Sequence, residues 1–249
     1  MNKSPLISVI TVVYNDRKHI EGTIRSVLEQ SYPHIEYVVV DGGSDDGTLD
    51  IIRSFGVSTL ISEPDKGLYD AMNKGLRAAT GNYVWFLNSG DKIYSSGTVA
   101  EMVSGLQGID ADVIYGGTMM IDEEGREIGD RRLKPPEKLS WRSFNQGMVV
   151  CHQSLIVKRS IAPLYKLEYR IAGDIDWAIG ATKKAVVLHH SGMLLSRFLE
   201  GGISGTNIKG GLRERFRIMT RYYGFVPTLL RHVLFGFRLT GFFIRHRRI

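Results

Sequence analysis

The stretch Gly81–Asp91 reads GNYVWFLNSGD, and it decides how the rest of the chain is interpreted. Gly81–Asn82 is a turn pair, and five aromatic, β-branched or aliphatic residues follow it. A continuous apolar run of this kind between turn signals is typical of a buried strand in a parallel sheet. The run ends at the polar tip Asn88–Asp91. Open α/β sheets bind ligands beyond the carboxyl ends of their strands, so this tip is predicted to lie at a ligand site. An ordinary turn is the alternative.

Three further strand-like runs come before this stretch, and helical segments separate them. The strands are predicted at Leu6–Val13, Ile35–Val40 and Val57–Ile61, and the helices at Arg17–Gln30, Leu49–Phe55 and Leu68–Ala79. Strands that alternate with helices predict right-handed βαβ units. The predicted fold class is therefore α/β, with a mostly parallel central sheet flanked by helices.

The pattern after residue 91 is looser. It predicts a helix at Thr98–Leu106, a strand at Val113–Tyr115, a hairpin at Met119–Gly129, a strand at Cys151–Lys158, a short helix opened by Ala172–Trp177, and strands at Val186–His190 and Met193–Arg197. We predict one domain over residues 1–205, with halves at 1–118 and 119–205, followed by a basic helical tail at 206–249.

Size and composition exclude several classes of protein. The 249 residues suffice for one large α/β domain, and 43% hydrophobic with 23% charged residues excludes a mostly disordered chain. The single cysteine, Cys151, cannot form an internal disulfide or a paired-cysteine zinc site, which fits a reducing cytosol. No apolar signal-peptide segment follows Lys3, so we expect no secretory signal peptide.

Positive charge is concentrated at the end of the chain. Residues Asn207–Ile249 contain ten Lys and Arg against one acid, Glu214, a balance of +9, whereas the rest of the chain carries −3. The tail is therefore expected to have a binding partner of its own.

The residues after Pro227 are predicted to form a basic amphipathic helix. One face carries Leu230, Leu234, Phe237, Gly241 and Ile244, and a second stripe carries Arg231, Arg238 and Arg245. A membrane-spanning helix needs about 20 consecutive apolar residues, and the arginines keep the apolar run shorter than that. This pattern favours an anionic membrane surface as the partner. A helix packed on the body, or a contact in a homo-oligomer, is the alternative, and no nucleic acid partner is expected because no recognition module accompanies the charge.

Four blocks of the sequence resemble the family 2 glycosyltransferases, which have the GT-A nucleotide-sugar-binding fold. The blocks are SVITVVYN at Ser8–Asn15, YVVVDGGSDDGT at Tyr37–Thr48, EPDKGLYDAMNKG at Glu63–Gly75 and GNYVWFLNSGD at Gly81–Asp91, in this order and spacing. A weaker match, AGDIDW followed by GGIS, covers Ala172–Ser204, and residues 121–150 and the tail are not covered. The chain looks most similar to bacterial members that build exopolysaccharide or O-antigen.

The resemblance implies an inverting, metal-dependent glycosyltransferase. Such an enzyme moves a sugar from a nucleoside diphosphate sugar to a hydroxyl of a lipid-linked or polysaccharide acceptor. Residues 1–118 would then bind the donor and residues 119–205 the acceptor, with the protein cytoplasmic and peripheral on the inner face of the cell membrane. The alternative is a non-catalytic nucleotide-sugar-binding or scaffolding subunit at the membrane. A sugar nucleotidyltransferase is disfavoured, because the N-terminus has no Gly-rich Arg-Lys signature.

The resemblance also assigns donor-binding residues at or near the ends of strands. They are Thr11, Tyr14, Asn15, Asp41, Lys66, Asn73, Asn88 and Ser89. Asp41 is expected to bind the base of the nucleotide and Lys66 to face its diphosphate. Strand termination, a turn or a solvated helix face is the structural alternative for each of them.

Asp91 resembles the metal-binding aspartate of the family, although two acids that many members carry beside it are missing from Asn88–Asp91. The implied cofactor is a divalent cation, Mn²⁺ or Mg²⁺. We expect it to bind weakly without nucleotide, because phosphate oxygens supply many of its ligands.

Asp174 resembles the catalytic base that takes a proton from the acceptor hydroxyl. Asp176 is the reserve candidate, and a helix N-cap is the alternative role of Asp174. His152, Gln153 and Asp176 are expected to lie on the acceptor side of the site.

Overall fold

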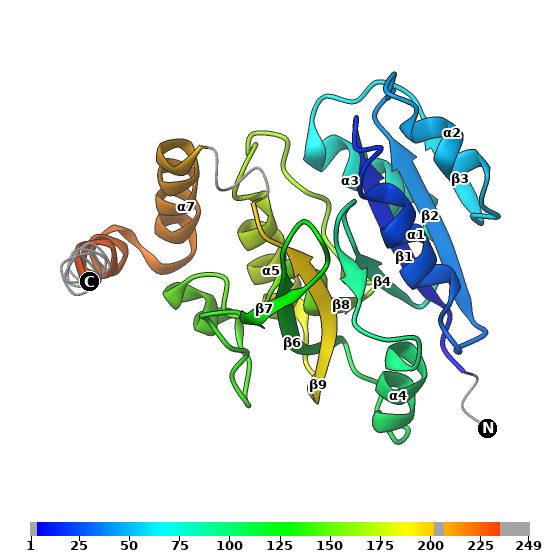
Figure 1. The fold of residues 1–249 in the computed structure, drawn as a ribbon. Helices are drawn as coiled ribbons and strands as arrows, with labels where there is room; N and C mark the ends of the chain where they lie inside the picture. Colours follow the sequence, from blue (N-terminus) through cyan, green and yellow to red (C-terminus); the bar gives the residue numbers. More distant parts are fainter. Residues whose placement is uncertain (1–3, 202–206, 235–249) are drawn as a thin grey trace, which may run out of the picture.

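The computed structural model describes residues 4–201 and 207–234, and it has one curved mixed sheet with helices on both faces (Figure 1). Along the sheet the strand order is β3-β2-β1-β4-β8-β6-β9-β5, and β7 pairs with β6 outside this path. The predicted α/β class is confirmed.

The first half of the chain forms the parallel part of the sheet. Its strands are β1 (Ile7–Val13), β2 (Ile35–Asp41), β3 (Thr59–Ser62) and β4 (Tyr83–Phe86), and its helices are α1 (Ile20–Leu28), α2 (Thr48–Arg53) and α3 (Leu68–Ala78). The strands pair in parallel in the order β3-β2-β1-β4. Every residue of β1 and β4 is buried, as the apolar runs predict.

Close packing of α3 on the sheet requires a glycine. A Cβ at Gly75 would lie 2.4 Å from Cγ2 of Ile10 in β1. Only a glycine at this position lets α3 approach the side chains of β1 and β2 so closely. α1 and α4 (Thr98–Gly105) bury their apolar residues in a second cluster, which also holds Trp85.

The second half of the sheet is mixed, because its last long strand pairs in parallel with a strand whose other neighbours are antiparallel to it. β8 (Leu155–Lys158) is antiparallel to both β4 and β6 (Val113–Ile121), and β6 forms a hairpin with β7 (Glu127–Asp130). β5 (Lys92–Ile93) pairs antiparallel with β9 (Leu188–Leu199). The two strands predicted at 186–197 are one strand, β9, whose register against β6 shifts near Gly192.

Helices α5 (Gly173–Lys184) and α7 (Ile208–Tyr223) pack against each other, and two short 3₁₀ helices, η1 (Trp141–Gln146) and η2 (His152–Ser154), lie between β7 and β8 in the chain. In α7, Ile218 and Met219 are buried. The carboxylate of Glu214 accepts hydrogen bonds from three consecutive backbone N–H groups at residues 170–172, each at 2.9 Å. The predicted boundary at residue 205 therefore falls before a helix that packs into the body.

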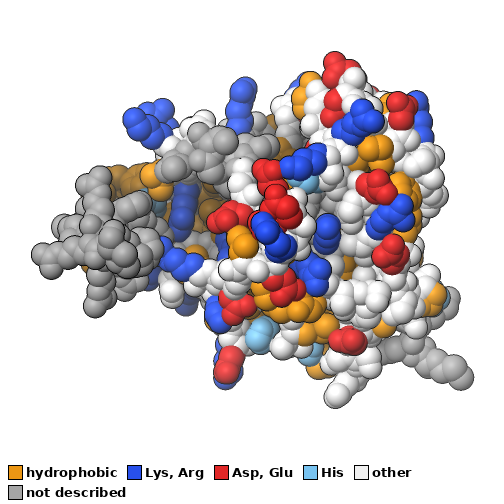
Figure 2. Space-filling model, viewed as in Figure 1, with side chains coloured by type: hydrophobic (Ala, Val, Ile, Leu, Met, Phe, Trp, Pro, Cys, Tyr) orange, Lys and Arg blue, Asp and Glu red, His pale blue; other side chains and the backbone are white. Residues whose placement is uncertain are grey.

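Residues 225–234 are helical and follow α7. Exposed apolar side chains on them are Phe225, Val226, Leu229, Leu230, Val233 and Leu234. Hydrophobic side chains are visible beside the grey atoms at the left of Figure 2, whereas acidic and basic side chains are interspersed over the centre of that face. The predicted stripe residues 237, 238, 241, 244 and 245 lie outside the described residues.

Within residues 4–201 and 207–234, no helix combines the length and the apolar character that a bilayer-crossing segment needs.

Candidate active site

The loops that follow β1 and β2 are fastened to each other by Asn15. Its backbone N–H donates to Ser44 Oγ at 2.8 Å, and its side-chain Oδ1 accepts from the backbone N–H of Asp45 at 3.0 Å. Asn15 has a φ of +48°, a left-handed conformation in which asparagine is one of the favoured residues. Asn15 therefore shapes the rim of the site through backbone contacts.

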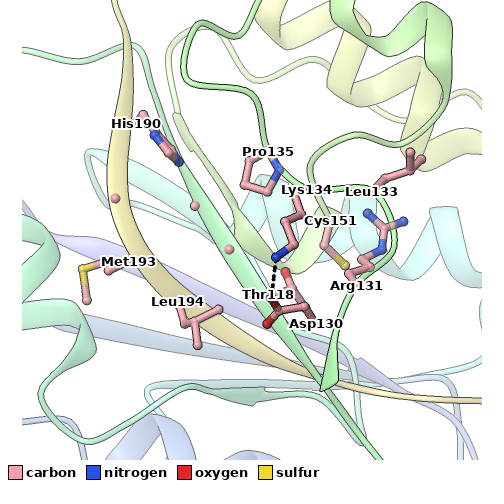
Figure 3. Close-up of a pocket in the computed structure, with 13 residues that line it drawn as sticks. Thr118, Asp130, Arg131, Leu133, Lys134, Pro135, Cys151, His190, Met193 and Leu194 are labelled. Carbon is pink, nitrogen blue, oxygen red and sulfur yellow. Dashed lines mark hydrogen bonds and ion pairs between the residues drawn. The ribbon is translucent and has the colours of Figure 1, made fainter. Parts of the chain in front are cut away.

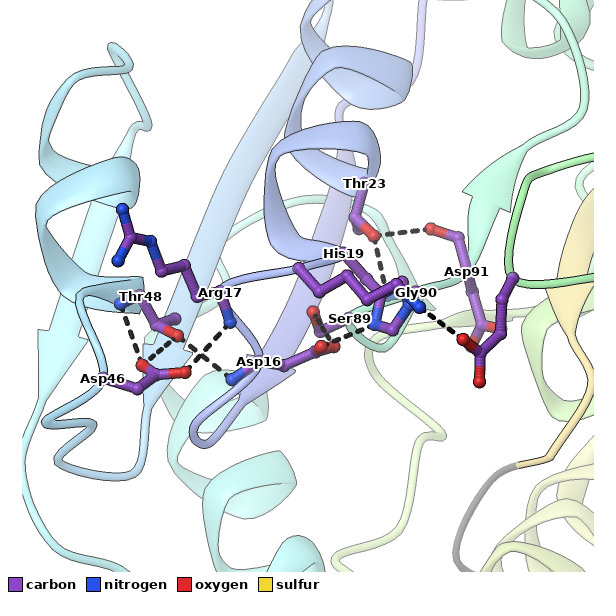
Figure 4. Close-up of polar contacts among 11 residues, drawn as sticks. Asp16, Arg17, His19, Thr23, Asp46, Thr48, Ser89, Gly90 and Asp91 are labelled. Carbon is purple, nitrogen blue, oxygen red and sulfur yellow. Dashed lines mark hydrogen bonds and ion pairs between the residues drawn. The ribbon is translucent and has the colours of Figure 1, made fainter.

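Asp16 joins three loops at this edge of the sheet (Figure 4). Its carboxylate accepts from Ser89 Oγ at 2.7 Å and contacts His19 Nδ1 at 2.6 Å. Its backbone N–H donates to Thr48 Oγ1 at 3.0 Å. The hydroxyl of Ser89, predicted to bind the donor, thus donates to Asp16. Asp16 is not among the predicted site residues, although it directly follows the first matching block.

Asp41 ends β2 with its side chain fully buried. Its carboxylate accepts from the hydroxyl of Ser62 at 2.7 Å and from the backbone N–H of Ser44 at 3.2 Å. Tyr14 lies nearby with 64% of its surface exposed, and its Cδ2 is 3.3 Å from the position of a Cβ at Gly42. An open aromatic face therefore lies beside a glycine at the tip of β2, which is an arrangement that can stack against a flat ring.

Lys66 is exposed just before α3. The backbone N–H groups at this end are occupied, because Lys66 N–H donates to Asp70 Oδ2 at 3.0 Å and Gly67 N–H donates to Asp65 Oδ1 at 2.7 Å. The ammonium of Lys66, rather than these two amides, is the group available to an anion.

Two residues predicted to bind the donor are enclosed in the fold. Thr11 is fully buried, and its hydroxyl accepts from Tyr37 at 3.1 Å. Asn73 is 3% exposed, and its amide forms two hydrogen bonds with the backbone of Tyr165, at 2.9 and 2.8 Å. The polar atoms of both side chains are therefore satisfied inside the protein, and a role of Thr11 and Asn73 in donor binding stays a prediction.

Asp91 is buried behind the tip of β4. Its Oδ1 accepts from the backbone N–H of Leu199 at 3.1 Å and its Oδ2 from Nε2 of Gln153 at 2.8 Å. Burial raises the pKa of its carboxyl to about 7. In the same turn, Oδ1 of Asn88 is buried and accepts no hydrogen bond from the residues that the structure describes. This turn therefore offers one carboxylate and one unsatisfied oxygen.

Asp174 lies in the first turn of α5, where Tyr69 from α3 holds the backbone. The hydroxyl of Tyr69 accepts from the N–H of Asp174 at 3.3 Å, and a Cβ at Gly173 would lie 2.7 Å from the Tyr69 ring. Burial raises the pKa of Asp174 to about 6, against the charges of Arg131 and Arg215. A carboxylate with this pKa is ionised at neutral pH and is a stronger base than an ordinary one.

The three residues predicted on the acceptor side are all buried. Nε2 of His152 hydrogen-bonds with the hydroxyl of Tyr165 at 2.6 Å, and burial lowers the pKa of His152 to about 4, so its ring is neutral. Gln153 bonds to the Asp91 carboxylate, and Asp176 pairs with Lys166 at 2.8 Å. These three side chains have partners inside the fold, and their place on the acceptor side stays a prediction.

Replacing Tyr69 by phenylalanine is expected to lower kcat by at most about tenfold. The change removes one hydrogen bond to the Asp174 N–H, worth roughly 0.5–1.5 kcal/mol, and 1.4 kcal/mol corresponds to a tenfold rate. The measurement is kcat beside the melting temperature. Tyr165→Phe is the matched control, because it also deletes a buried tyrosine hydroxyl but contacts His152 instead. An equal loss of kcat in both variants would contradict a specific role for Tyr69.

The chain is similar in sequence and in structure to known glycosyltransferases. The family model described as glycosyl transferase family 2 matches residues 8–162. An uncharacterized glycosyltransferase of Mycobacterium tuberculosis is 35% identical over 189 residues, which cover 73% of this chain and 70% of that protein. The PGL/p-HBAD biosynthesis glycosyltransferase of Mycobacterium bovis is 30% identical over 234 residues, which cover 88% of this chain and 86% of that protein.

Solved structures show the same fold at low sequence identity. Residues 1–349 of S. aureus TarS in complex with UDP-GlcNAc match with a TM-score of 0.70 and 20% identity, covering 92% of this chain and 73% of that one. The mannosyltransferase PcManGT from Pyrobaculum calidifontis, in complex with GDP-Man and Mn²⁺, matches with a TM-score of 0.65 and 19% identity, covering 88% and 65%.

Proposed function

The chain belongs to glycosyl transferase family 2, and on that premise we propose that it is an inverting enzyme using a nucleoside diphosphate sugar and a lipid-linked or polysaccharide acceptor. The observation that carries this proposal is Asp174. It lies at the start of α5 and contacts α3 through Tyr69, and its pKa is raised by burial. An inverting transfer needs one such carboxylate as a general base.

In the proposed reaction, Asp174 accepts the proton of an acceptor hydroxyl. The freed oxygen forms a bond to the anomeric carbon of the donor, and the bond from that carbon to the diphosphate breaks on the opposite face. The nucleoside diphosphate leaves with the electron pair, so the anomeric configuration inverts. Tyr69 and the three hydrogen bonds to Glu214 hold the backbone around the base during this step.

For the donor, we propose that the base of the nucleotide stacks on Tyr14 beside Gly42, with Asp41 below it. Lys66 would face the diphosphate as a point charge. Support comes from the exposed ring of Tyr14, the burial of Asp41 at the end of β2, and the exposure of Lys66. Asn15 and Ser89 would act by fixing the rim, through Ser44 and Asp16 respectively. Residues 1–118 would then be the donor half and residues 119–205 the acceptor half.

The turn Asn88–Asp91 fits a divalent cation that phosphate oxygens hold in large part. Asn88 supplies an unsatisfied amide oxygen. Each oxygen of the Asp91 carboxylate accepts one hydrogen bond and keeps a further lone pair for a ligand, and oxygen ligands suit Mn²⁺ and Mg²⁺. Among the described residues no group of three or more His, Cys, Asp and Glu could hold a metal, so we propose that the nucleotide completes the site. A cation bound there would neutralise charge on the departing diphosphate.

The donor assignment is tested by the melting temperature with UDP-, GDP- and dTDP-sugars, each with and without Mn²⁺. A ligand that binds the folded state raises the melting temperature according to its concentration relative to Kd. We expect the sugars of one of the three nucleotides to raise the melting temperature clearly, and to raise it more when Mn²⁺ is present. No rise with any nucleotide sugar would contradict the proposal. Binding without hydrolysis or transfer would favour the alternative, a non-catalytic nucleotide-sugar-binding subunit.

We further propose that residues 225–234 dock the protein on an anionic membrane, where a lipid-linked acceptor lies. Leu230 and Leu234 are each 60% exposed on this helix, and Arg231 lies between them in the sequence. Apolar burial and attraction of basic side chains to anionic lipid act together at such a surface. The protein would then be peripheral on the inner face of the cell membrane.

Changing Leu230, Val233 and Leu234 together to asparagine is expected to lower the affinity of the protein for anionic liposomes at least tenfold. Each fully buried leucine is worth about 1.5–3 kcal/mol. Co-sedimentation with vesicles measures this, and nucleotide-sugar binding should persist. Leu164 and Leu167, which are 50% and 52% exposed elsewhere on the body, supply the matched control. Liposome binding that survives the triple change would refute the docking role.

A further inference from the structure

Two arginines from distant parts of the chain are held at one loop. Arg131, which follows β7, donates from Nη1 to the carbonyl oxygen of Met148 at 2.6 Å. Arg215, in the middle of α7, donates from Nη2 to the carbonyl oxygen of Gln146 at 3.4 Å. Because these two carbonyls are two residues apart, the guanidinium groups are kept near each other.

The loop between the carbonyls closes onto Arg215. Gly147 has a φ of +116°, in the region that favours glycine, and a Cβ there would lie 2.3 Å from Nη2 of Arg215. A side chain at position 147 would therefore push the guanidinium away. The glycine leaves room for the cation.

The base lies near this pair, because Glu214, the neighbour of Arg215 in α7, binds the backbone N–H groups at residues 170–172, just before Asp174. The charges of both guanidinium groups lower the pKa of Asp174 against the larger effect of burial. Burial, first, and the charge of Arg131 lower the pKa of Arg215, while Asp174 raises it. The three side chains therefore form one electrostatic cluster with two cations and one anion.

Arg131 retains hydrogen-bonding capacity in this cluster. A guanidinium carries five N–H donors, and within the described part of the chain Arg131 makes one hydrogen bond, to Met148. Figure 3 shows its side chain next to Cys151, at a pocket of about 240 Å³. The planar fork of a guanidinium matches the oxygens of a phosphate.

We propose that Arg131 and Arg215 bind a phosphate group of the acceptor next to Asp174. This inference rests on the proposed function. Both arginines come from segments after residue 118, outside the predicted donor half. Helix α7, which carries Arg215, leads directly into the exposed apolar residues 225–234. A phosphate attached to an apolar chain fits this combination, with the phosphate at the arginines and the chain toward that helix.

The test is titration calorimetry of the full chain with geranyl diphosphate, a short lipid diphosphate. The protein is first saturated with the nucleoside diphosphate that raises its melting temperature most, so that the donor's diphosphate site is filled. Arg131→Gln and Arg215→Gln are each expected to weaken geranyl diphosphate binding at least tenfold, while nucleotide-sugar affinity stays within twofold. Arg213→Gln, an exposed arginine on the same helix, should bind as the wild type does.

Charge-retaining variants show whether the fold is intact. Arg131→Lys and Arg215→Lys should bind geranyl diphosphate between the wild type and the glutamine variants, because lysine keeps the charge but not the fork. The inference is overturned if the wild type does not bind geranyl diphosphate, if the glutamine variants bind it normally, or if Arg213→Gln weakens it equally. It is also overturned if the glutamine variants lose nucleotide-sugar affinity instead, which would assign the arginines to the donor.

The test separates this inference from the proposed function. Wild-type protein that binds no nucleotide sugar would remove the donor assignment. The titration is then run without nucleotide, and the comparison of the Arg131, Arg215 and Arg213 variants still decides whether the pair binds a phosphate.

Discussion

Replacing Asp174 by asparagine is expected to lower kcat by about 10²–10⁴-fold, the range typical for loss of a general base. Asparagine keeps the size of the side chain and its hydrogen bond to the backbone N–H of Ile175, but it cannot accept the proton. Nucleotide-sugar binding, measured by calorimetry, should stay within a few-fold of the wild type. Asp176→Asn is the matched control, because Asp176 pairs with Lys166 and should affect stability more than turnover. A collapse of kcat in Asp176→Asn with normal kcat in Asp174→Asn would reverse the assignment.

The pH dependence gives an independent check on the same residue. Because the base must be ionised, activity should fall about tenfold per pH unit below a pKa near 6. Stability should move the other way. The folded pKa of Asp174 is raised above the unfolded value of 3.8, so the folded state loses stability as pH rises from about 4 to 6. The Asp174→Asn variant lacks this loss. At pH 8 its free energy of unfolding should exceed that of the wild type by roughly 3 kcal/mol at most. Equal melting temperatures at pH 8 would argue against the buried charge.

Replacing Asp91 by asparagine is expected to abolish the effect of Mn²⁺ on nucleotide-sugar binding and to destabilise the protein. The cation would lose its carboxylate, so Kd in Mn²⁺ should approach Kd in EDTA. The N–H of Leu199 and the amide of Gln153 both donate to this carboxylate. In asparagine one of the two oxygens becomes an NH₂ group, so one of these donors would face another donor. An unsatisfied buried donor costs about 1–3 kcal/mol.

A matched control separates the two effects. Asp112 also accepts two backbone N–H groups, from Val186 and Val187 at 2.7 and 3.0 Å. Asp112→Asn should therefore lower the melting temperature while leaving the Mn²⁺ effect intact. If Asp91→Asn behaves in the same way as Asp112→Asn, Asp91 is structural only and any cation binds elsewhere.

The parallel half of the fold could be predicted from the sequence because its signals are local. Each buried strand is a continuous apolar run, and the residues that end the runs at Asn15, Asp41 and Asn88 lie at one edge of the sheet. The second half could not be predicted as well. The antiparallel insertion of β8 between β4 and β6 depends on pairing with segments about 70 and about 40 residues earlier in the chain, and no local sequence pattern predicts such pairing.

The same distinction applies to the candidate site. Asn73 lies in a block typical of donor binding, but its amide is paired with Tyr165, 92 residues away. Gln153 is predicted on the acceptor side, and its amide bonds to Asp91, 62 residues before it. Arg131 and Arg215 had no signal, because a lone arginine in an unmatched segment looks like any surface charge. The type of a functional side chain could be predicted where a motif contains it. The side chains and backbone groups that it bonds to in the fold could not.

The hydrogen bonds between Glu214 and the backbone at 170–172 also bear on where a chimera of this chain and a relative could be joined. A chimera joined at residue 205 would import a foreign α7 and break the contacts that support the segment before Asp174. A junction at Gly224 would keep them, since α7 ends there at a residue with a φ of +87°. We therefore expect a chimera joined at Gly224 to fold better than one joined at residue 205.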